Sequence, residues 1–414
     1  MVVLGEVLAP DGVEPGRSSD GPSGGCEAGV QAPSARWVRG LPHERYRRLT
    51  DEGMGAMGEV AGPSSDVEVI ARGVASAAAP EGGLEPAQAS LLGAVIESLF
   101  GQAVDVAGLD AIAAEDLAAA LADRDEAFRR RLVHHMVLAE LILRPIPPEV
   151  ARRVARYAEA LGVEDRFVRV ARRYAQGAFD LAWLDLHRSG FAEHWEAARM
   201  DQLKTDARLP DPLAAGVVDQ ELAGRWASFE HLEAGTLGRS VWEMYTGRGF
   251  GLPGTEGGAS AYLAQHDFVH VLADYGTNLF GELEVFSLIG DADPDPKGFA
   301  WIATLVGLFE TGYVADAGFF TSDVKQRHLD SPGMHHRMAD AMARGRAVCD
   351  VLGTDLLELD YHERADRPVA VVRRELGIPD KSAAARRAGS PGAFEVQGLS
   401  RIQQRYAASF GRGT

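Results

Sequence analysis

The sequence His266-Asp267-Phe268-Val269-His270 is followed, after eleven further residues, by Glu282. On an α-helix the two histidines lie one turn apart on the same face, a spacing that lets two imidazoles bind one metal ion. Asp267 lies about 100° around the helix from His266 but only three residues from His270. It is therefore a candidate ligand, or a residue that orients one of the imidazoles.

Glu282 can join this site only if the chain turns back after the second histidine. In one straight helix it would lie roughly 18 Å further along the axis, at about 1.5 Å per residue. Gly276 suits the left-handed end of a helix, and Thr277 or Asn278 suits the start of the next one. Residues 279–289 then read as a second helix. If that helix folds back beside the first, Glu282 completes a His, Asp, His and Glu site.

Two histidines and two carboxylates suit Zn²⁺, with Fe²⁺ or Mn²⁺ as alternatives, because these metals accept nitrogen and oxygen ligands. A position left open on the metal would polarise a bound water or a substrate oxygen. The His-x-x-x-His spacing is weak evidence by itself, and an unrelated metal-dependent hydrolase stays an alternative. Two hydrolase classes fit poorly. Asp267 stands where zincins carry glutamate, and the earlier histidine and distant aspartate of an HD-type phosphohydrolase do not stand out.

Apolar residues recur at three- and four-residue spacing along most of the chain, which predicts helices. The clearest segments are residues 87–103, 114–123, 125–144, 148–162 and 164–188. Prolines at 145, 147 and 148 end one helix and start the next, because proline is tolerated only in a first turn. Alternating strand patterns are scarce, so the predicted fold class is all-α.

Composition divides the chain into segments. The first 85 residues contain 15 Gly and 7 Pro and cannot bury enough apolar surface to offset chain entropy, which predicts a disordered N-terminal arm. The remaining segments are a helical bundle at residues 86–202 that resembles small TerB-like domains, a linker at 203–224, a multi-helix metal-binding domain at 225–380 and a tail at 381–414.

The charge balance argues against one class of protein. Sixty acidic against 42 basic residues give a net charge of −18, which argues against nucleic-acid binding because a phosphate backbone requires a basic surface.

Cysteine content and apolar stretches exclude two further classes. Two cysteines, Cys26 and Cys349, cannot form a cysteine-based zinc module, and they suit a reducing cytoplasm. The longest apolar stretch, residues 299–314, is interrupted by Gly and Glu and falls short of the roughly 20 residues that span a bilayer.

The order His-Asp-x-x-His-x(11)-Glu resembles the metal motif of the ubiquinone (coenzyme Q) biosynthesis protein four family. Leu-Glu-Ala-Gly-Thr-Leu-Gly-Arg at residues 232–239 is similar to a Leu-Pro-Glu-Gly-Thr-Leu-Gly-Arg stretch of that family. Asn-Leu-Phe-Gly-Glu at 278–282 is similar to its Thr-Asn-x-x-Gly-Glu segment. Its closing pattern resembles residues 345–347, 360–363 and 373–378. The resemblance covers about residues 225–380.

Members of that family are all-helical, bind zinc through the motif residues, lie peripherally on membranes and organise enzymes of quinone biosynthesis. The resemblance therefore implies that Zn²⁺ is bound by His266, Asp267, His270 and Glu282. It also implies a metal-dependent lyase activity, the oxidative decarboxylation of a prenylated hydroxybenzoate at ring carbon one. The implied location is the cytoplasm, with peripheral contact at the inner face of the membrane.

The resemblance leaves a non-catalytic alternative, a lipid-binding scaffold with a structural metal whose helical bundle recruits biosynthetic enzymes. Ala234 and Leu283 depart from the family pattern, which leaves another prenylated or aromatic metabolite open as the ligand. The expected partners are a prenylated aromatic or quinone precursor, biosynthetic enzymes, a membrane surface and a second copy of the chain. Candidates for a prenyl slot, with ordinary core packing as the alternative, are Phe268, Leu272, Phe280, Phe286, Phe299, Trp301 and Phe309.

Overall fold

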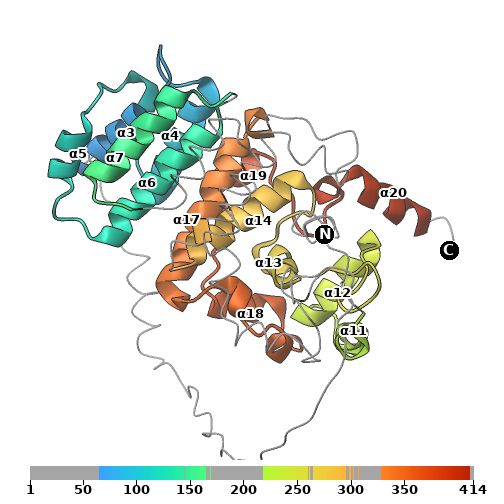
Figure 1. Ribbon diagram of the computed structural model, residues 1–414. Coiled ribbons are helices and arrows are strands. Elements are labelled where there is room, and N and C mark those ends of the chain that lie inside the picture. The colour runs from blue at the N-terminus through green and yellow to red at the C-terminus, as the bar shows by residue number, and fades with distance from the viewer. Residues whose placement is uncertain are drawn as a thin grey trace, which may run out of the picture. The chain divides into compact units, whose positions relative to one another are not determined.

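Helices make up the regular structure of the described part of the chain (Figure 1). The computed structural model describes residues 65–143, 145–164, 168, 218–259, 261, 264–294, 298–299, 302, 306 and 328–410. Over these residues there is no β-strand, only an isolated bridge between Thr236 and Pro368. The predicted all-α fold class is confirmed.

The first group of helices, here the N-terminal bundle, gathers at one side of Figure 1 in blue to green. Asp125 begins one of its helices by accepting a hydrogen bond from the Phe128 N–H, and Pro148 occupies the first turn of another. The buried Gln88 amide donates to the carbonyls of Ala78 and Ala139, tying three helices together. The helices are α3 (Ser65–Ala78), α4 (Pro86–Phe100), η1 (Val106–Gly108), α5 (Ala114–Ala120), α6 (Glu126–Leu141) and α7 (Pro148–Ala160).

The predicted limit of the disordered N-terminal arm at residue 85 is wrong, because helix α3 precedes it. The helix lies within residues 1–85, yet Ile70, Ala71 and Val74 are buried in the core. Their three- and four-residue spacing outweighs the alanine- and glycine-rich composition on which the prediction of disorder was based. Residues 1–64, most of the predicted helix at 164–188 and most of the predicted linker lie outside the described residues.

The second group of helices contains the segment with the two histidines. In sequence order its helices are α11 (Gln220–Ala227), η3 (Ser228–His231), α12 (Leu237–Arg248), α13 (Gln265–Ala273), α14 (Leu279–Ala292), η5 (His328–Asp330), α17 (Met334–Leu352), η6 (Leu356–Glu358), η7 (His362–Arg364), α18 (Val369–Glu375), α19 (Ala383–Arg387), η8 (Val396–Gly398) and α20 (Arg401–Phe410). Helices α19 and α20 show that the predicted tail at 381–414 is regular structure over much of its length.

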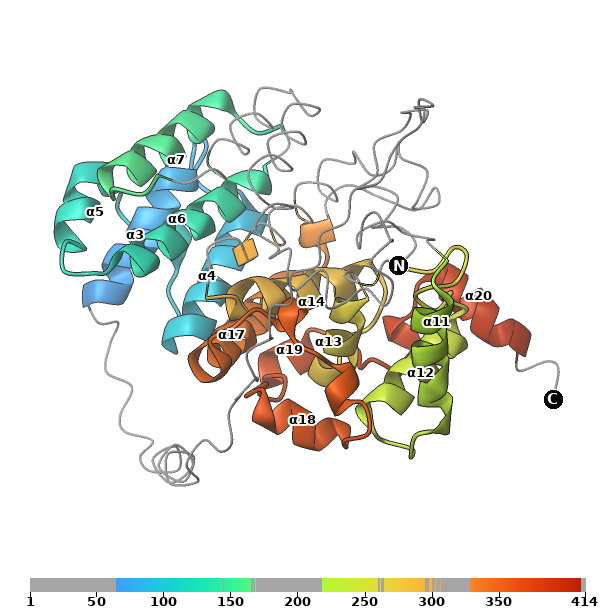
Figure 2. The same ribbon diagram turned by 60° about the horizontal axis from the view of Figure 1, so that its bottom comes forward.

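Helix α17 connects the two groups, because it packs along α14 and also against α4 (Figure 2). A buried ion pair of 2.6 Å joins Arg337 of α17 to Glu284 of α14. Near the other end of α17, the backbone of Gly345 lies so close to α14 that a Cβ atom there would stand 2.2 Å from the Leu288 carbonyl oxygen. The position of α14 is therefore fixed by direct backbone contact with α17.

None of the described helices is long and apolar enough to cross a membrane. Most of the apolar stretch at residues 299–314 lies outside the described residues.

We expect Gly345→Ala to lower the free energy of unfolding by about 1–3 kcal/mol, because the new methyl group forces α14 and α17 apart. Gly247→Ala is the matched control. Gly247 lies within α12, and a Cβ there meets nothing within 4 Å, so alanine should be neutral or stabilise by up to about 1 kcal/mol. Urea unfolding of both variants measures the difference, and equal stability of the two would contradict the close crossing.

Candidate metal centre

Helices α13 and α14 bring together all four residues that the sequence singled out. The His266 Nε2 atom lies 3.7 Å from Asp267 Oδ1 and 3.4 Å from Glu282 Oε2. The His270 Nε2 atom lies 3.4 Å from the same Glu282 oxygen. His266, Asp267 and His270 each offer one ligand atom, and these three atoms lie within 4.8 Å of one another.

The turn between the two helices differs from the prediction in one detail. Asp274, not Gly276, takes the left-handed conformation at the end of α13, with φ of 60°. Aspartate tolerates this conformation better than most residues, and its carboxylate also accepts a hydrogen bond from the Ala393 N–H at 3.0 Å. The predicted start of α14 is confirmed, because the Asn278 side chain accepts a hydrogen bond from the Gly281 N–H.

Gly276 instead allows a backbone contact with the C-terminal segment. A Cβ atom at Gly276 would lie 2.5 Å from the Gly398 Cα atom. The N–H groups of Thr277 and Asn278 donate to the Gly398 carbonyl at 2.8 and 2.9 Å. Gly398, which lies in the segment predicted as a tail, therefore packs directly against the turn between α13 and α14.

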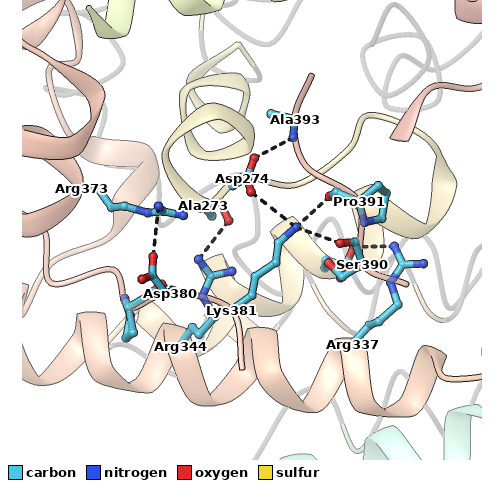
Figure 3. Close-up of polar contacts among 12 residues, drawn as sticks. Ala273, Asp274, Arg337, Arg344, Arg373, Asp380, Lys381, Ser390, Pro391 and Ala393 are labelled. Atoms are coloured by element: carbon cyan, nitrogen blue, oxygen red, sulfur yellow. Dashed lines mark hydrogen bonds and ion pairs between the residues drawn. The ribbon is translucent and has the colours of Figure 1, made fainter. Parts of the chain in front are cut away.

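Basic side chains hold the same segment against the end of α13 (Figure 3). The Lys381 ammonium donates to the Pro391 carbonyl at 2.8 Å and lies 3.9 Å from Asp274. Arg344 of α17 donates to the carbonyl of Ala273, the last residue of α13, at 2.9 Å. The positive charge of Arg344 thus satisfies a carbonyl at the end of α13, where a cation is favourable. Lys381 links Asp274, just after that end, to the C-terminal segment.

The site is buried, and its polar atoms face one another. The side chains of His266, Asp267 and His270 are at most 1% exposed, whereas Glu282 is 13% exposed. Within the described residues, no hydrogen bond satisfies Asp267 Oδ1, His270 Nε2 or Glu282 Oε2. Buried polar atoms are normally paired, because an unpaired one costs free energy. A cation among these atoms would satisfy all of them together.

The two carboxyl groups respond differently to burial. Burial acts to raise the pKa of Glu282, but the imidazoles of His270 and His266 outweigh it and hold that pKa well below its ordinary value. Burial raises the pKa of Asp267 in spite of the same imidazoles. Glu282 is thus the stronger source of negative charge before any cation binds.

Tyr245 is a site residue that sequence reasoning missed. Its hydroxyl donates a hydrogen bond to Asp267 Oδ2, which leaves Oδ1 facing the histidines. Burial, together with the charge of Asp267, raises the pKa of the phenol well above its ordinary value, so it stays a donor. Tyr245 lies on α12, outside the His-Asp-x-x-His motif, and only the packing of α12 on α13 brings it to the site.

Several candidates for the prenyl slot are core residues. Phe268 stacks on Tyr361 with ring centroids 4.8 Å apart and also packs against Trp226. Leu272 and Phe286 are buried, and Phe280 is partly buried beside His328. Phe299 stacks on His134 of the N-terminal bundle. Trp301 and Phe309 lie outside the described residues.

Other histidines do not repeat the arrangement of the site. His335 and His336 lie together in the first turn of α17, and His362 packs against Trp226 and Phe229. Over the part of the chain that the structure describes, one group of His, Cys, Asp and Glu residues is close enough to share a metal ion, and it is the one on α13.

Comparison with known proteins finds no match among family models, curated proteins or solved structures.

We expect Tyr245→Phe to weaken metal binding by about 10–100-fold, because it removes the hydrogen bond that orients Asp267. Tyr361→Phe is the matched control, since its buried hydroxyl donates to the Leu356 carbonyl away from the four residues. Both variants should lose about 1–3 kcal/mol of stability, while only the first should change the affinity measured by calorimetric metal titration. An unchanged affinity in Tyr245→Phe would remove Tyr245 from the site.

Proposed function

We propose that His266, Asp267, His270 and Glu282 bind a divalent metal ion. The supporting observation is that four side chains of ligand type, from two helices, face one another in a buried place. Within the described residues, Asp267 Oδ1, His270 Nε2 and Glu282 Oε2 form no hydrogen bond there. Two imidazoles and two carboxylates suit Zn²⁺, with Fe²⁺ and Mn²⁺ as competitors. Two carboxylates would also balance the charge of a divalent ion once both are ionised.

We further propose that the metal serves an enzyme acting on an aromatic acid. Support for this comes from the resemblance to the ubiquinone biosynthesis family, whose members are credited with decarboxylating a prenylated hydroxybenzoate. When bound, the metal would polarise a carboxylate or phenolic oxygen of such a substrate. The residues of the chain supply the rest: Tyr245 orients Asp267, and the partly exposed Glu282 marks the side from which a substrate approaches.

One observation favours a second candidate, a lipid-binding scaffold with a structural metal. Three of the four side chains are at most 1% exposed, and closed sites with four protein ligands are typical of structural zinc. In this candidate the N-terminal bundle would recruit biosynthetic enzymes, and contact with a membrane surface would be peripheral.

Metal analysis of the purified full-length chain tests the proposal. We expect about one metal ion per chain in the unaltered protein, and loss of most of it in His270→Ala and Glu282→Gln. His335→Ala is the matched control, because His335 lies in the first turn of α17 and should leave the metal content unchanged. Full metal retention in both site variants would reject the site.

Folding and turnover then separate the two candidates. Loss of metal with loss of the helical circular dichroism signal favours the structural role. Loss of metal with an intact fold favours the enzyme, and the decisive measurement is release of CO₂ from a prenylated hydroxybenzoate under air. No release by the metal-loaded protein would reject this substrate class.

A further inference from the structure

A cavity of about 550 Å³ lies away from the four metal-site residues. Its size falls in the range of about 300–1,000 Å³ that is typical of small-molecule sites. Helices α3, α4 and α6 of the N-terminal bundle provide one wall, and α14 and α17 line the other side. Most of the bundle's lining residues are apolar, among them Ile70, Val74, Leu92, Val95, Leu99 and Phe128, and its polar ones are Asp125, Arg131 and His135.

One end of this cavity is polar. Arg131 and His135 of α6 and Asp291 of α14 line it, and the same three residues also line a neighbouring cavity of about 300 Å³. They therefore stand at the boundary between the two cavities. A ligand that fills both would place its chain among the helices of the bundle and its head group beside these three side chains.

The groups at this end are suited to donate hydrogen bonds. Arg131 Nη2 contacts the Cys349 sulfur at 3.6 Å, and a thiol is a weak acceptor. Asp291 Oδ2 is buried and forms no hydrogen bond within the described residues. Burial raises the pKa of Asp291 to about 7, so this carboxyl retains a proton in much of the population near neutral pH. Burial lowers the pKa of His135 to about 4, which leaves its imidazole neutral with one N–H to donate.

We propose that this cavity binds a single-chain amphiphile, with its apolar chain between α3, α4 and α6 and an anionic head group on Arg131. A guanidinium pairs with a carboxylate or phosphate in a two-point contact. Asp291 and His135 would donate to the remaining oxygens of the same head group. Arg346 already pairs with Asp350 at 3.1 Å, so Arg131 is the main anchor. The shared chemistry is an unbranched or prenyl chain that ends in a carboxylate or a phosphate monoester.

Calorimetric titration of the full-length chain with oleate, dodecyl phosphate and dodecanol tests the proposal. We expect one molecule of oleate or dodecyl phosphate per chain, with the tighter of the two identifying the head group. Dodecanol should bind at least tenfold more weakly, because it lacks the charge. The proposal would be overturned if dodecanol bound as tightly as both anions, or if neither anion bound.

Variants then test the anchor. Arg131→Gln should weaken binding of the better anion at least tenfold. Arg152→Gln, an identical change at an exposed position of α7 that does not line the cavity, should leave it unchanged. Val74→Phe, which fills the chamber from α3, should also weaken binding, and its thermal midpoint and metal content report whether it folds. Unchanged affinity in Arg131→Gln, or in a folded Val74→Phe, would overturn the assignment.

The cavity and the metal site can fail separately. None of the four metal-site residues lines the cavity, so His270→Ala should lose metal and still bind oleate if it remains folded. Arg131→Gln should keep its metal. Loss of oleate binding in a folded His270→Ala protein would overturn the independence of the two sites.

Discussion

The backbone contact between Gly276 and Gly398 holds the short turn that joins the histidine-bearing helix α13 to α14. At this point two glycines approach so closely that a Cβ atom on either would lie within 3 Å of the other's Cα atom. The same Gly398 carbonyl accepts two hydrogen bonds from the turn. Glu282 reaches His266 and His270 because this turn is short and fixed from outside.

The cost of the arrangement is electrostatic. Two imidazoles and two carboxylates are largely removed from water, and Asp267 Oδ1, His270 Nε2 and Glu282 Oε2 have no hydrogen-bonding partner within the described residues. Such burial is unfavourable unless a counter-charge is present. The hydrogen bond from Tyr245 compensates for part of the cost at Asp267. A divalent cation would compensate for the charge of the carboxylates, which is the physical reason for proposing a metal centre here.

The sequence predicts much of this structure where the signals are local. Apolar spacing predicts the helices. Three of the helix starts are predicted by single residues, namely Asp125, Pro148 and Asn278. Local signals fail where distant segments decide the outcome. From the sequence, Gly276 is predicted to end a helix. In the structure, glycine is needed there because the backbone of Gly398, 122 residues later, packs against it. Asp274 takes the left-handed conformation instead.

Two further features could not be read from the sequence for the same reason. Tyr245 lies far from the motif along the chain and reaches Asp267 only through the packing of two helices. The polar end of the large cavity combines Arg131 with Asp291, which come from opposite groups of helices. The predictions from composition, a disordered arm that includes α3 and a tail after residue 380, were wrong for these two segments. Both segments are rich in alanine, glycine and arginine, which obscure the few apolar or polar residues that anchor them.

X-ray absorption spectroscopy of the chain loaded with Zn²⁺ identifies the atoms that bind the metal. We expect nitrogen and oxygen ligands at about 2.0–2.2 Å, with outer-shell scattering from two imidazoles. A sulfur ligand at about 2.3 Å, or a shell without imidazole scattering, would contradict a metal centre built from His266, Asp267, His270 and Glu282.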